Sequence, residues 1–323
     1  MNTVGQQPLP PNCIVLLGPT AVGKTALGVR IAIATAAHIL SADSRQVYRG
    51  LDIGSGKDLA DYTVDGTSVP YHLIDIADLA HEYNVFNYQQ DFYAVFAGLQ
   101  KKNILPLVVG GTGLYLDAVV RNYDLLDVPK DETLRSGLAE KTLDELDGIL
   151  LNLKPELHNK TDLLQRQRVV RAIEIEAYMR SESLVEKRKK MVPRPDVRPL
   201  VIGSTLPRPL LRENIRIRLQ ERMDAGLIDE VQALHDRGTS WSRLEQLGLE
   251  YRFVSEYLQG KIASYDELFT SLNIAIRRFA KRQETWFRGM ERKGVSIHWL
   301  PSVPDSEEKY KAALQLIHTY VMH

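Results

Sequence analysis

The stretch that decides the fold is Gly18-Pro19-Thr20-Ala21-Val22-Gly23-Lys24-Thr25, which matches the phosphate-binding pattern G-x-x-x-x-G-K-[ST]. The apolar run at residues 14–17 precedes it and predicts a buried strand, and a helix is predicted over residues 23–36. In such a loop, backbone N–H groups and the positive end of the helix dipole face one point. Lys24 adds a charge there, and the Thr25 hydroxyl can hold Mg²⁺. We therefore predict a diphosphate-sized anion at this loop; the alternative is a glycine-rich turn with no ligand.

The segments around this loop alternate between strand-like and helix-like patterns. Strands are expected at residues 39–41, 71–74, 106–109, 200–203 and 295–300, and helices at residues 87–101, after residue 113 and from about residue 306. This alternation indicates an α/β fold, with a parallel, doubly wound sheet of the P-loop type. Such sheets bind ligands at the carboxyl ends of their strands, where Gly18, Asp43 and Gly110-Gly111-Thr112 would lie.

A helical insertion interrupts this alternation. From about residue 131 to residue 190 the apolar residues recur at spacings of three and four, and three prolines follow between residues 193 and 199. We place the catalytic core at residues 1–119 and 200–323, and the insertion at residues 120–199.

Composition narrows the class of protein. The chain has 323 residues, 44% of them hydrophobic, and its 41 basic side chains balance 41 acidic ones. The net charge by itself therefore gives no sign for or against a nucleic-acid partner, and the distribution of the charges matters more. The single cysteine, Cys13, excludes disulfides within the chain and cysteine-based zinc sites.

No signal peptide and no apolar run of about 20 residues is present, so we expect a cytoplasmic protein with no membrane segment. We also expect a monomer. The sequence contains neither H-E-x-x-H nor G-x-S-x-G, so zinc hydrolysis and serine-triad chemistry are unsupported.

Asp43 is the first candidate for chemistry. It follows the predicted strand at residues 39–41 directly, which suits a general base or a magnesium contact facing the phosphate loop. The alternative is an Asx-turn or a helix cap at the strand exit. Residues 110–115 form a second glycine-rich turn that could approach a ligand closely, or could simply join a strand to a helix.

Two clusters of basic residues fit either a polyanion or a solvated face. In the predicted helix at residues 276–290, we expect most of the stripe of Ile276, Phe279, Gln283, Trp286 and Met290 to pack inward. The other faces carry Arg277, Arg278, Lys281, Arg282, Arg288, Arg292 and Lys293. The second cluster is Lys187-Arg188-Lys189-Lys190, with Arg166, Arg168 and Arg171 upstream.

Taken together, several segments resemble the tRNA dimethylallyltransferase family of bacterial type. They are the phosphate loop, Ser41–Tyr48, Leu51–Lys57, His72–Asp75, Gly110–Tyr115, Arg168–Glu174, Ala225–Val231 and Ala280–Arg288. The resemblance spans about residues 12–290. It implies transfer of a dimethylallyl group from dimethylallyl diphosphate to the exocyclic N6 amine of the adenosine 3′ to the anticodon, with release of pyrophosphate.

The resemblance also implies roles for individual residues. Asp43 matches the family's base, Thr20 would contact the reacting centre, and Arg218 matches an arginine at the start of a late helix that stabilises the leaving group. Diphosphate binding would fall to Gly18, Thr20, Ala21, Gly23, Lys24 and Thr25, with Thr25 as the ligand of Mg²⁺. The insertion would grip the tRNA anticodon stem-loop, and tRNA binding would fall to Ser44, Gln46, Arg168, Arg171, Arg278, Lys281, Arg282 and Gln283.

Two departures from the family pattern concern the choice of tRNA. Leu164-Gln165-Arg166-Gln167 stands where the family usually has Asn-Pro before its arginines, and Gly248-Leu249-Glu250-Tyr251 replaces a more usual Gly-Tyr-Lys-Glu.

Three alternatives share the phosphate loop. A transferase acting on free adenine nucleotides would need no large RNA-binding insertion. A small-molecule kinase would bind ATP at the loop, yet no feature for adenine recognition is evident. A non-catalytic RNA-binding protein would have no use for an intact Lys24, Thr25 and Asp43.

Overall fold

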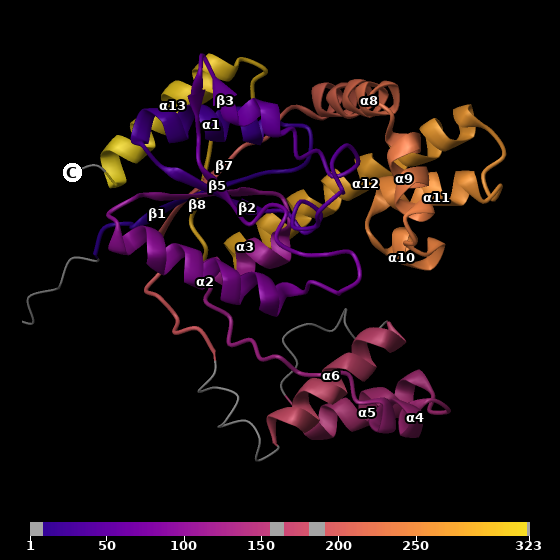
Figure 1. Ribbon diagram of the computed structural model, residues 1–323. Coiled ribbons are helices and arrows are strands. Elements are labelled where there is room, and N and C mark those ends of the chain that lie inside the picture. The colour runs from indigo at the N-terminus through magenta and orange to yellow at the C-terminus, as the bar shows by residue number, and fades with distance from the viewer. Residues whose placement is uncertain (1–8, 156–164, 181–190, 322–323) are drawn as a thin grey trace, which may run out of the picture. The chain divides into compact units, whose positions relative to one another are not determined.

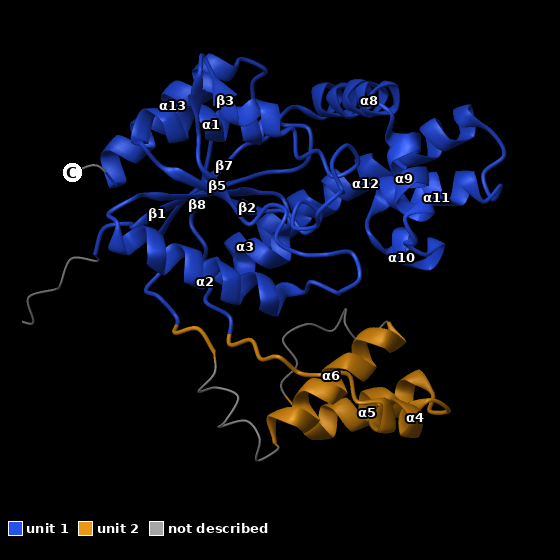
Figure 2. Cartoon of the chain, in the orientation of Figure 1, with its two compact units in different colours: residues 1–123, 194–323 blue, residues 124–193 orange. Residues whose placement is uncertain are grey.

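The structure is a computed structural model that describes residues 9–155, 165–180 and 191–321. The chain forms two compact units, Met1–Tyr123 with Arg194–His323 and Asp124–Pro193 (Figure 2). The second unit is shorter at both ends than the predicted insertion at residues 120–199. Residue 120 still belongs to helix α3, Gly113–Val120, and residue 199 begins strand β7, Pro199–Gly203.

A six-stranded sheet forms the centre of the first unit, in the order β5-β2-β6-β1-β7-β8, and every neighbouring pair is parallel. The remaining strands are β1 Cys13–Leu17, β2 His38–Ala42, β5 Tyr71–His72, β6 Pro106–Gly110 and β8 Ile297–Trp299. Leu17 pairs with both Gly110 and Gly203, so the carboxyl ends of the central strands share one edge. The strand predicted at residues 71–74 ends early because Leu73 and Asp75 adopt left-handed backbone angles, with φ of 65° and 55°.

Helices cover both faces of this sheet (Figure 1). Helices α1 Lys24–Thr35 and α13 Ser306–Tyr320 pack on one face, where Leu27 and Ile317 are buried against strand residues such as Leu16. Helices α2 Val85–Lys101 and α3 lie on the other face. A short 3₁₀ helix, η1 Leu59–Tyr62, and a hairpin of β3 Thr63–Val64 and β4 Thr67–Ser68 precede β5. These small elements have no periodic sequence pattern, and the sequence did not predict them.

A helical group gathers at the carboxyl edge of the sheet (Figure 1). It comprises α8 Arg208–Asp224, α9 Leu227–Asp236, α10 Trp241–Gln246, α11 Leu249–Leu258 and α12 Tyr265–Arg292. These helices share one hydrophobic core, which includes residues from α8, α9, α11 and α12.

Most of the stripe predicted to pack inward on α12 does so, with two exceptions. Ile276, Gln283 and Met290 are buried, but Phe279 and Trp286 are 37% and 40% exposed. The core takes Ala280 and Phe287 instead, again at spacings of three and four. Phe279 lines a cavity beside the sheet, and a Cβ atom at Gly113 would meet Trp286 at 2.5 Å.

The second unit contains helices α4 Glu132–Leu138, α5 Leu143–Leu153 and α6 Arg166–Met179, which bury Leu146, Val169 and neighbouring apolar side chains in a core of their own. The buried carboxylate of Glu174 accepts hydrogen bonds from Arg135 at 2.6 and 2.9 Å and from Arg171 at 3.0 Å. The Arg135 hydrogen bond is the main cause that lowers the pKa of Glu174 to about 2, against the opposing effect of burial. This ionic cluster fixes α6 against α4.

In the described ranges, no helix is both long and apolar enough to cross a membrane.

Candidate active site

A cavity of about 370 Å³ opens at the carboxyl edge of the sheet. The phosphate loop, residues 43–46 and residues 110–112 all line it, as the strand pattern predicts. Its remaining walls come from residues 54–56, from Tyr62, from α8, from residues 245–252 of the α10–α11 region and from α12, which the sequence did not assign to one cavity. The site therefore combines loops of the sheet with helices far along the chain.

The phosphate loop is curled as its motif requires. Ala21 and Gly23 have left-handed backbone angles, with φ of 62° and 80°, and such turns direct successive N–H groups toward an anion. Gly18 packs so closely on the carbonyl of Ser204 that a Cβ atom would overlap it. Thr20 and Thr25 both line the cavity.

Gln283 joins the phosphate loop to the glycine-rich turn of residues 110–112 by hydrogen bonds. Its Oε1 accepts a hydrogen bond from the backbone N–H of Thr20 at 2.9 Å, and its Nε2 donates to the carbonyl of Gly111 at 2.8 Å. The side chain is 7% exposed. Gln283 was predicted to bind tRNA; the structure shows it joining α12 to two loops of the sheet while also lining the cavity.

Lys24 carries a charge that is poorly compensated. Its Nζ donates to the carbonyl of Pro19 at 2.6 Å. Burial, and next the charge of Arg218, lower the pKa of Lys24 to about 7, although Asp43 acts in the opposite direction. An anion bound beside Lys24 would therefore favour the charged form of this side chain.

Asp43 forms the Asx-turn that its position allows, and it also lines the cavity. Its Oδ1 accepts from the backbone N–H of Arg45 at 2.8 Å and of Gln46 at 3.4 Å, which is the Asx-turn. Among the described residues, its Oδ2 has no hydrogen-bond partner, and the residue lines the cavity. One oxygen holds the turn, and the other is available for a proton.

The next residues along this loop also hold it in place. The Ser44 N–H donates to Thr112 Oγ1 at 3.0 Å. Gln46 accepts from Ser41 Oγ at 2.8 Å and donates to the carbonyl of Gly56 at 2.9 Å. Both residues, which were predicted to contact tRNA, line the cavity, and Gln46 is already bonded at both ends of its amide.

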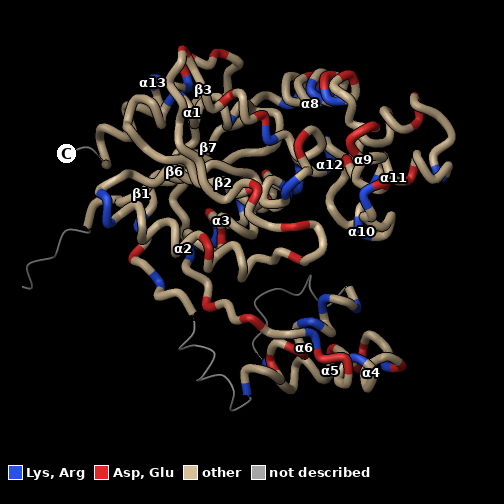
Figure 3. The backbone as a smooth tube through the Cα atoms, in the orientation of Figure 1, with Lys and Arg blue, Asp and Glu red and all other residues tan. Residues whose placement is uncertain are grey.

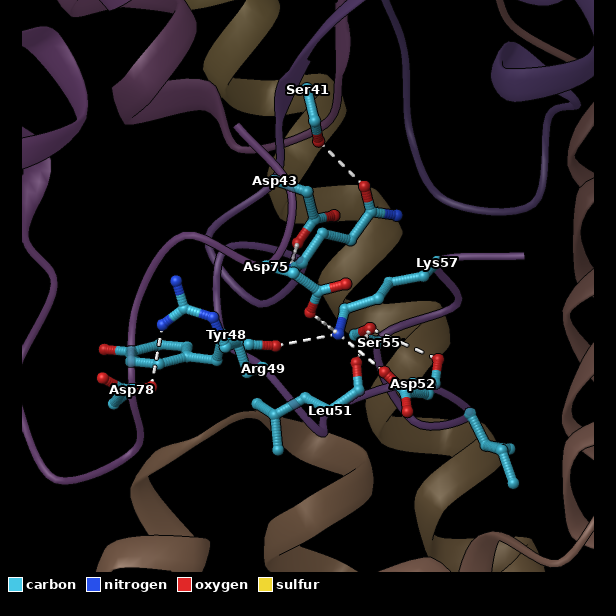
Figure 4. Close-up of polar contacts among 12 residues, drawn as sticks. Ser41, Asp43, Tyr48, Arg49, Leu51, Asp52, Ser55, Lys57, Asp75 and Asp78 are labelled. Carbon is cyan, nitrogen blue, oxygen red and sulfur yellow. Dashed lines mark hydrogen bonds and ion pairs between the residues drawn. The ribbon is translucent and has the colours of Figure 1, made fainter. Parts of the chain in front are cut away.

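The segment of residues 48–57, of which residues 54–56 line the cavity, is anchored twice. The buried Nζ of Lys57 donates to the carbonyl of Tyr48 at 2.8 Å, to Asp52 at 2.7 Å and to Asp75 (Figure 4). On the other side, the carboxylate of Glu230 accepts from the backbone N–H groups of residues 52, 53 and 54 at 2.7–3.1 Å. Sequence reasoning did not find these anchors, because they join segments far apart in the chain.

Two arginines of α8 border the same wall. The Arg218 Nη2 lies 2.9 Å from Asp58 Oδ2, and Arg218 lines the cavity. The resemblance placed Arg218 at the start of a late helix, but it lies in the second half of α8. Arg222, which the sequence analysis missed, lines the cavity one turn later. Its i, i+4 spacing from Arg218 was the available signal.

The basic residues predicted on α12 face different surfaces. Arg282 lines the main cavity, whereas Arg278 and Lys281 line a neighbouring groove between α8 and α12. All three are exposed, and none forms an ion pair with a described residue. Figure 3 marks basic positions along the backbone of α12 in blue.

The predicted tRNA-binding residues of the insertion lie in the second unit, separate from this cavity's lining. Arg168 and Arg171 belong to α6. Arg171 donates to the carbonyl of Val128 at 2.6 Å besides its bond to Glu174, so it holds its own unit together. Lys187–Lys190 lie outside the described residues.

Comparisons with known proteins agree with this geometry. The sequence matches the IPP transferase family over residues 46–290 and the isopentenyl transferase family over residues 11–75. It is 51% identical to tRNA dimethylallyltransferase 1 of Syntrophus aciditrophicus over 304 residues, which are 94% of this chain and 97% of the relative. It is also 51% identical to tRNA dimethylallyltransferase 2 of Treponema denticola, covering 90% of this chain and 95% of that relative.

Solved structures share the fold. The full-length tRNA isopentenylpyrophosphate transferase of Bacillus halodurans matches with a TM-score of 0.68 and 30% identity, covering 96% of this chain and 97% of that one. A eukaryotic dimethylallyltransferase acting on tRNA matches with a TM-score of 0.73 at 20% identity, covering 95% and 78%. With the phosphate loop, Asp43 and the cavity they share, these matches show that the chain is an enzyme of the IPP transferase family, the tRNA dimethylallyltransferases.

Proposed function

We propose that the protein transfers a dimethylallyl group from dimethylallyl diphosphate to the exocyclic N6 of the adenosine 3′ to the anticodon in tRNA. The observation that supports this most directly is one cavity that holds the phosphate loop, Lys24 and a carboxylate with an unpaired oxygen, Asp43 Oδ2. A diphosphate at the loop and an adenine amine at Asp43 would meet in that cavity.

The reaction forms the bond between N6 and C1 of the dimethylallyl group and breaks the bond between C1 and the diphosphate oxygen. The electron pair of the broken bond leaves with pyrophosphate, and the N6 proton passes to Asp43. Lys24 and Arg218 stabilise the charge that grows on the leaving group. Thr20, whose backbone N–H is held by Gln283, borders the reacting centre.

Mg²⁺ fits the donor set of this site only with help from its substrate. The described residues contain no group of three or more His, Cys, Asp or Glu side chains that could hold a metal. Thr25 lines the cavity, and a magnesium ion commonly takes one or two protein oxygens together with phosphate oxygens. We propose that Thr25 holds such an ion, which when bound neutralises charge on the diphosphate.

The RNA partner is supported by the exposed cations of α12. Arg278, Lys281 and Arg282 flank the cavity and its neighbouring groove without ion-pair partners among the described residues. Phosphate groups of an anticodon stem-loop would neutralise them. We propose that the second unit binds the same stem-loop.

The decisive experiment is mass analysis of tRNA nucleosides after incubation of the pure protein with dimethylallyl diphosphate. We expect a dimethylallyl adenosine in tRNA and release of pyrophosphate. Parallel reactions with free AMP, and with ATP in place of the prenyl donor, test the two small-molecule alternatives. Prenylation of AMP without modification of tRNA would contradict the proposal, and so would phosphoryl transfer from ATP.

A further inference from the structure

Arg222 is the one deeply placed cation of the cavity to which the transfer chemistry above gives no role. Its side chain is 13% exposed, and it lines the cavity from α8. Its buried Nε has no hydrogen-bond partner among the described residues. A buried donor left without a partner costs about 1–3 kcal/mol, so its presence beside a ligand cavity calls for an explanation.

Arg222 has few polar partners, and its contacts with them are long. Its Nη1 lies 3.4 Å from the carbonyl of Gly54 and 3.5 Å from Glu250 Oε1. Burial, and next the charge of Arg218, lower the pKa of Arg222, and Glu250, Asp58 and Tyr251 only partly oppose them. Glu250 stands in the segment that departs from the family's usual Gly-Tyr-Lys-Glu, so this chain has a carboxylate where that pattern has a lysine.

Arg222 and Arg218 meet at Gly56. The Nη2 atoms of both arginines are so close to this residue that a Cβ atom there would overlap both. Gly56 also has a left-handed backbone, with φ of 61°, so both its conformation and its neighbours require glycine. Arg218 pairs with Asp58 at 2.9 Å and Arg222 lies 3.5 Å from Glu250, so each of these like charges has one carboxylate of its own. A shared anion would stabilise both charges further, because they lie one helical turn apart.

We infer that Arg222 is a phosphate-binding residue of the cavity, which with Arg218 forms a two-guanidinium site for a phosphoryl oxygen. The inference rests on the proposed function, because two substrates of that reaction bring phosphoryl groups to this wall. One is the diphosphate of the prenyl donor, which Lys24 and Arg218 face. The other is a backbone phosphate of the RNA next to the target adenosine.

A set of variants separates this role from simple pairing with Glu250. Arg222→Gln removes the guanidinium, and Glu250→Gln removes its carboxylate partner while keeping Arg222. Arg216→Gln is the matched control, because Arg216 lies on the same helix, is 46% exposed and pairs with Glu213 at 2.7 Å. Pyrophosphate affinity is measured by calorimetry, and tRNA affinity by filter binding across a salt series.

If the diphosphate is the ligand, Arg222→Gln should weaken pyrophosphate binding about tenfold to a hundredfold, the scale of a lost charge-assisted hydrogen bond. If an RNA phosphate is the ligand, tRNA binding should weaken instead, with the log–log salt slope smaller by roughly 0.7–0.9. In either case Glu250→Gln should bind the same anion at least as tightly as wild type, since it leaves Arg222 uncompensated.

The inference is overturned if Arg222→Gln leaves both affinities within twofold of wild type, or if Glu250→Gln causes the same loss as Arg222→Gln. Should Arg222→Gln fail to fold, the double variant with Glu250→Gln leaves no carboxylate unpaired and takes its place, judged against Glu250→Gln alone. Wild-type transfer to tRNA is assayed in parallel. An inactive wild type would contradict the proposed function, while the pyrophosphate affinities would still decide the role of Arg222.

Discussion

Asp43 uses one carboxylate oxygen in the Asx-turn and leaves the other without a partner in the described part of the chain. Its proposed role as the base can therefore be tested separately from its role in the turn. Asp43→Asn keeps an Oδ1 that can accept from Arg45 and Gln46, so the Asx-turn and tRNA binding should persist. The loss of the base should lower the single-turnover rate about a hundredfold or more. Rapid-quench kinetics at saturating tRNA, with thermal unfolding as a control, measure this. A normal rate with collapsed tRNA binding would assign Asp43 to recognition instead.

The lowered pKa of Lys24 predicts that proton uptake on diphosphate binding depends on pH. Its pKa of about 7 in the free protein means that the side chain loses its proton as the pH rises above 7. A bound diphosphate favours the charged form and raises that pKa again, so binding should take up protons, more at pH 8 than at pH 6. Calorimetry in two buffers of different ionisation enthalpy measures the uptake. Lys24→Gln, compared at saturating ligand, should lack it; equal uptake in both proteins would refute this account.

At the scale of elements, α12 carries three roles at once. It buries a core face, fastens two loops through Gln283 and exposes cations. Changing Arg278, Lys281 and Arg282 together to Gln should weaken tRNA binding and lower its log–log salt slope by roughly 0.7–0.9 per lost phosphate contact. Filter binding across a salt series measures both. The matched control changes three exposed lysines outside the cavity, Lys101, Lys102 and Lys311. An unchanged slope in the α12 variant would remove this helix from the RNA interface.

Elements and loops with local signals could be predicted from the sequence. The phosphate loop, its strand and its helix are coded within a few residues, and the strand exits at Asp43 and Gly110 follow from parallel pairing. The anchors of the cavity could not be predicted in this way. Glu230 meets the backbone of residues 52–54, and Gln283 meets Thr20, only after distant helices have packed. The exposure of Phe279 and Trp286 likewise depends on what α12 packs against.

At the scale of the whole molecule, the two units are each built on a core of their own. The ends that flank the second unit meet at Tyr93, which donates to Asn122 at 2.7 Å and lies within range of the charge of Arg194. Replacing residues 124–193 with a short Gly-Ser linker should therefore keep the first unit folded. Pyrophosphate binding should persist and tRNA affinity should fall, as calorimetry and filter binding would measure. Unchanged tRNA affinity would exclude the second unit from RNA recognition.

The strand order has a consequence for how the protein is made. Strand β1 lies between β6 and β7, yet β7 follows the whole second unit in the chain. On the ribosome, one edge of the fully apolar β1 must wait unpaired while residues 111–198 are synthesised, which at about 5–20 residues per second takes several seconds. An unpaired apolar edge is a template for aggregation. The nascent chain is thus most vulnerable before β7 emerges, and the second unit sets the length of that interval.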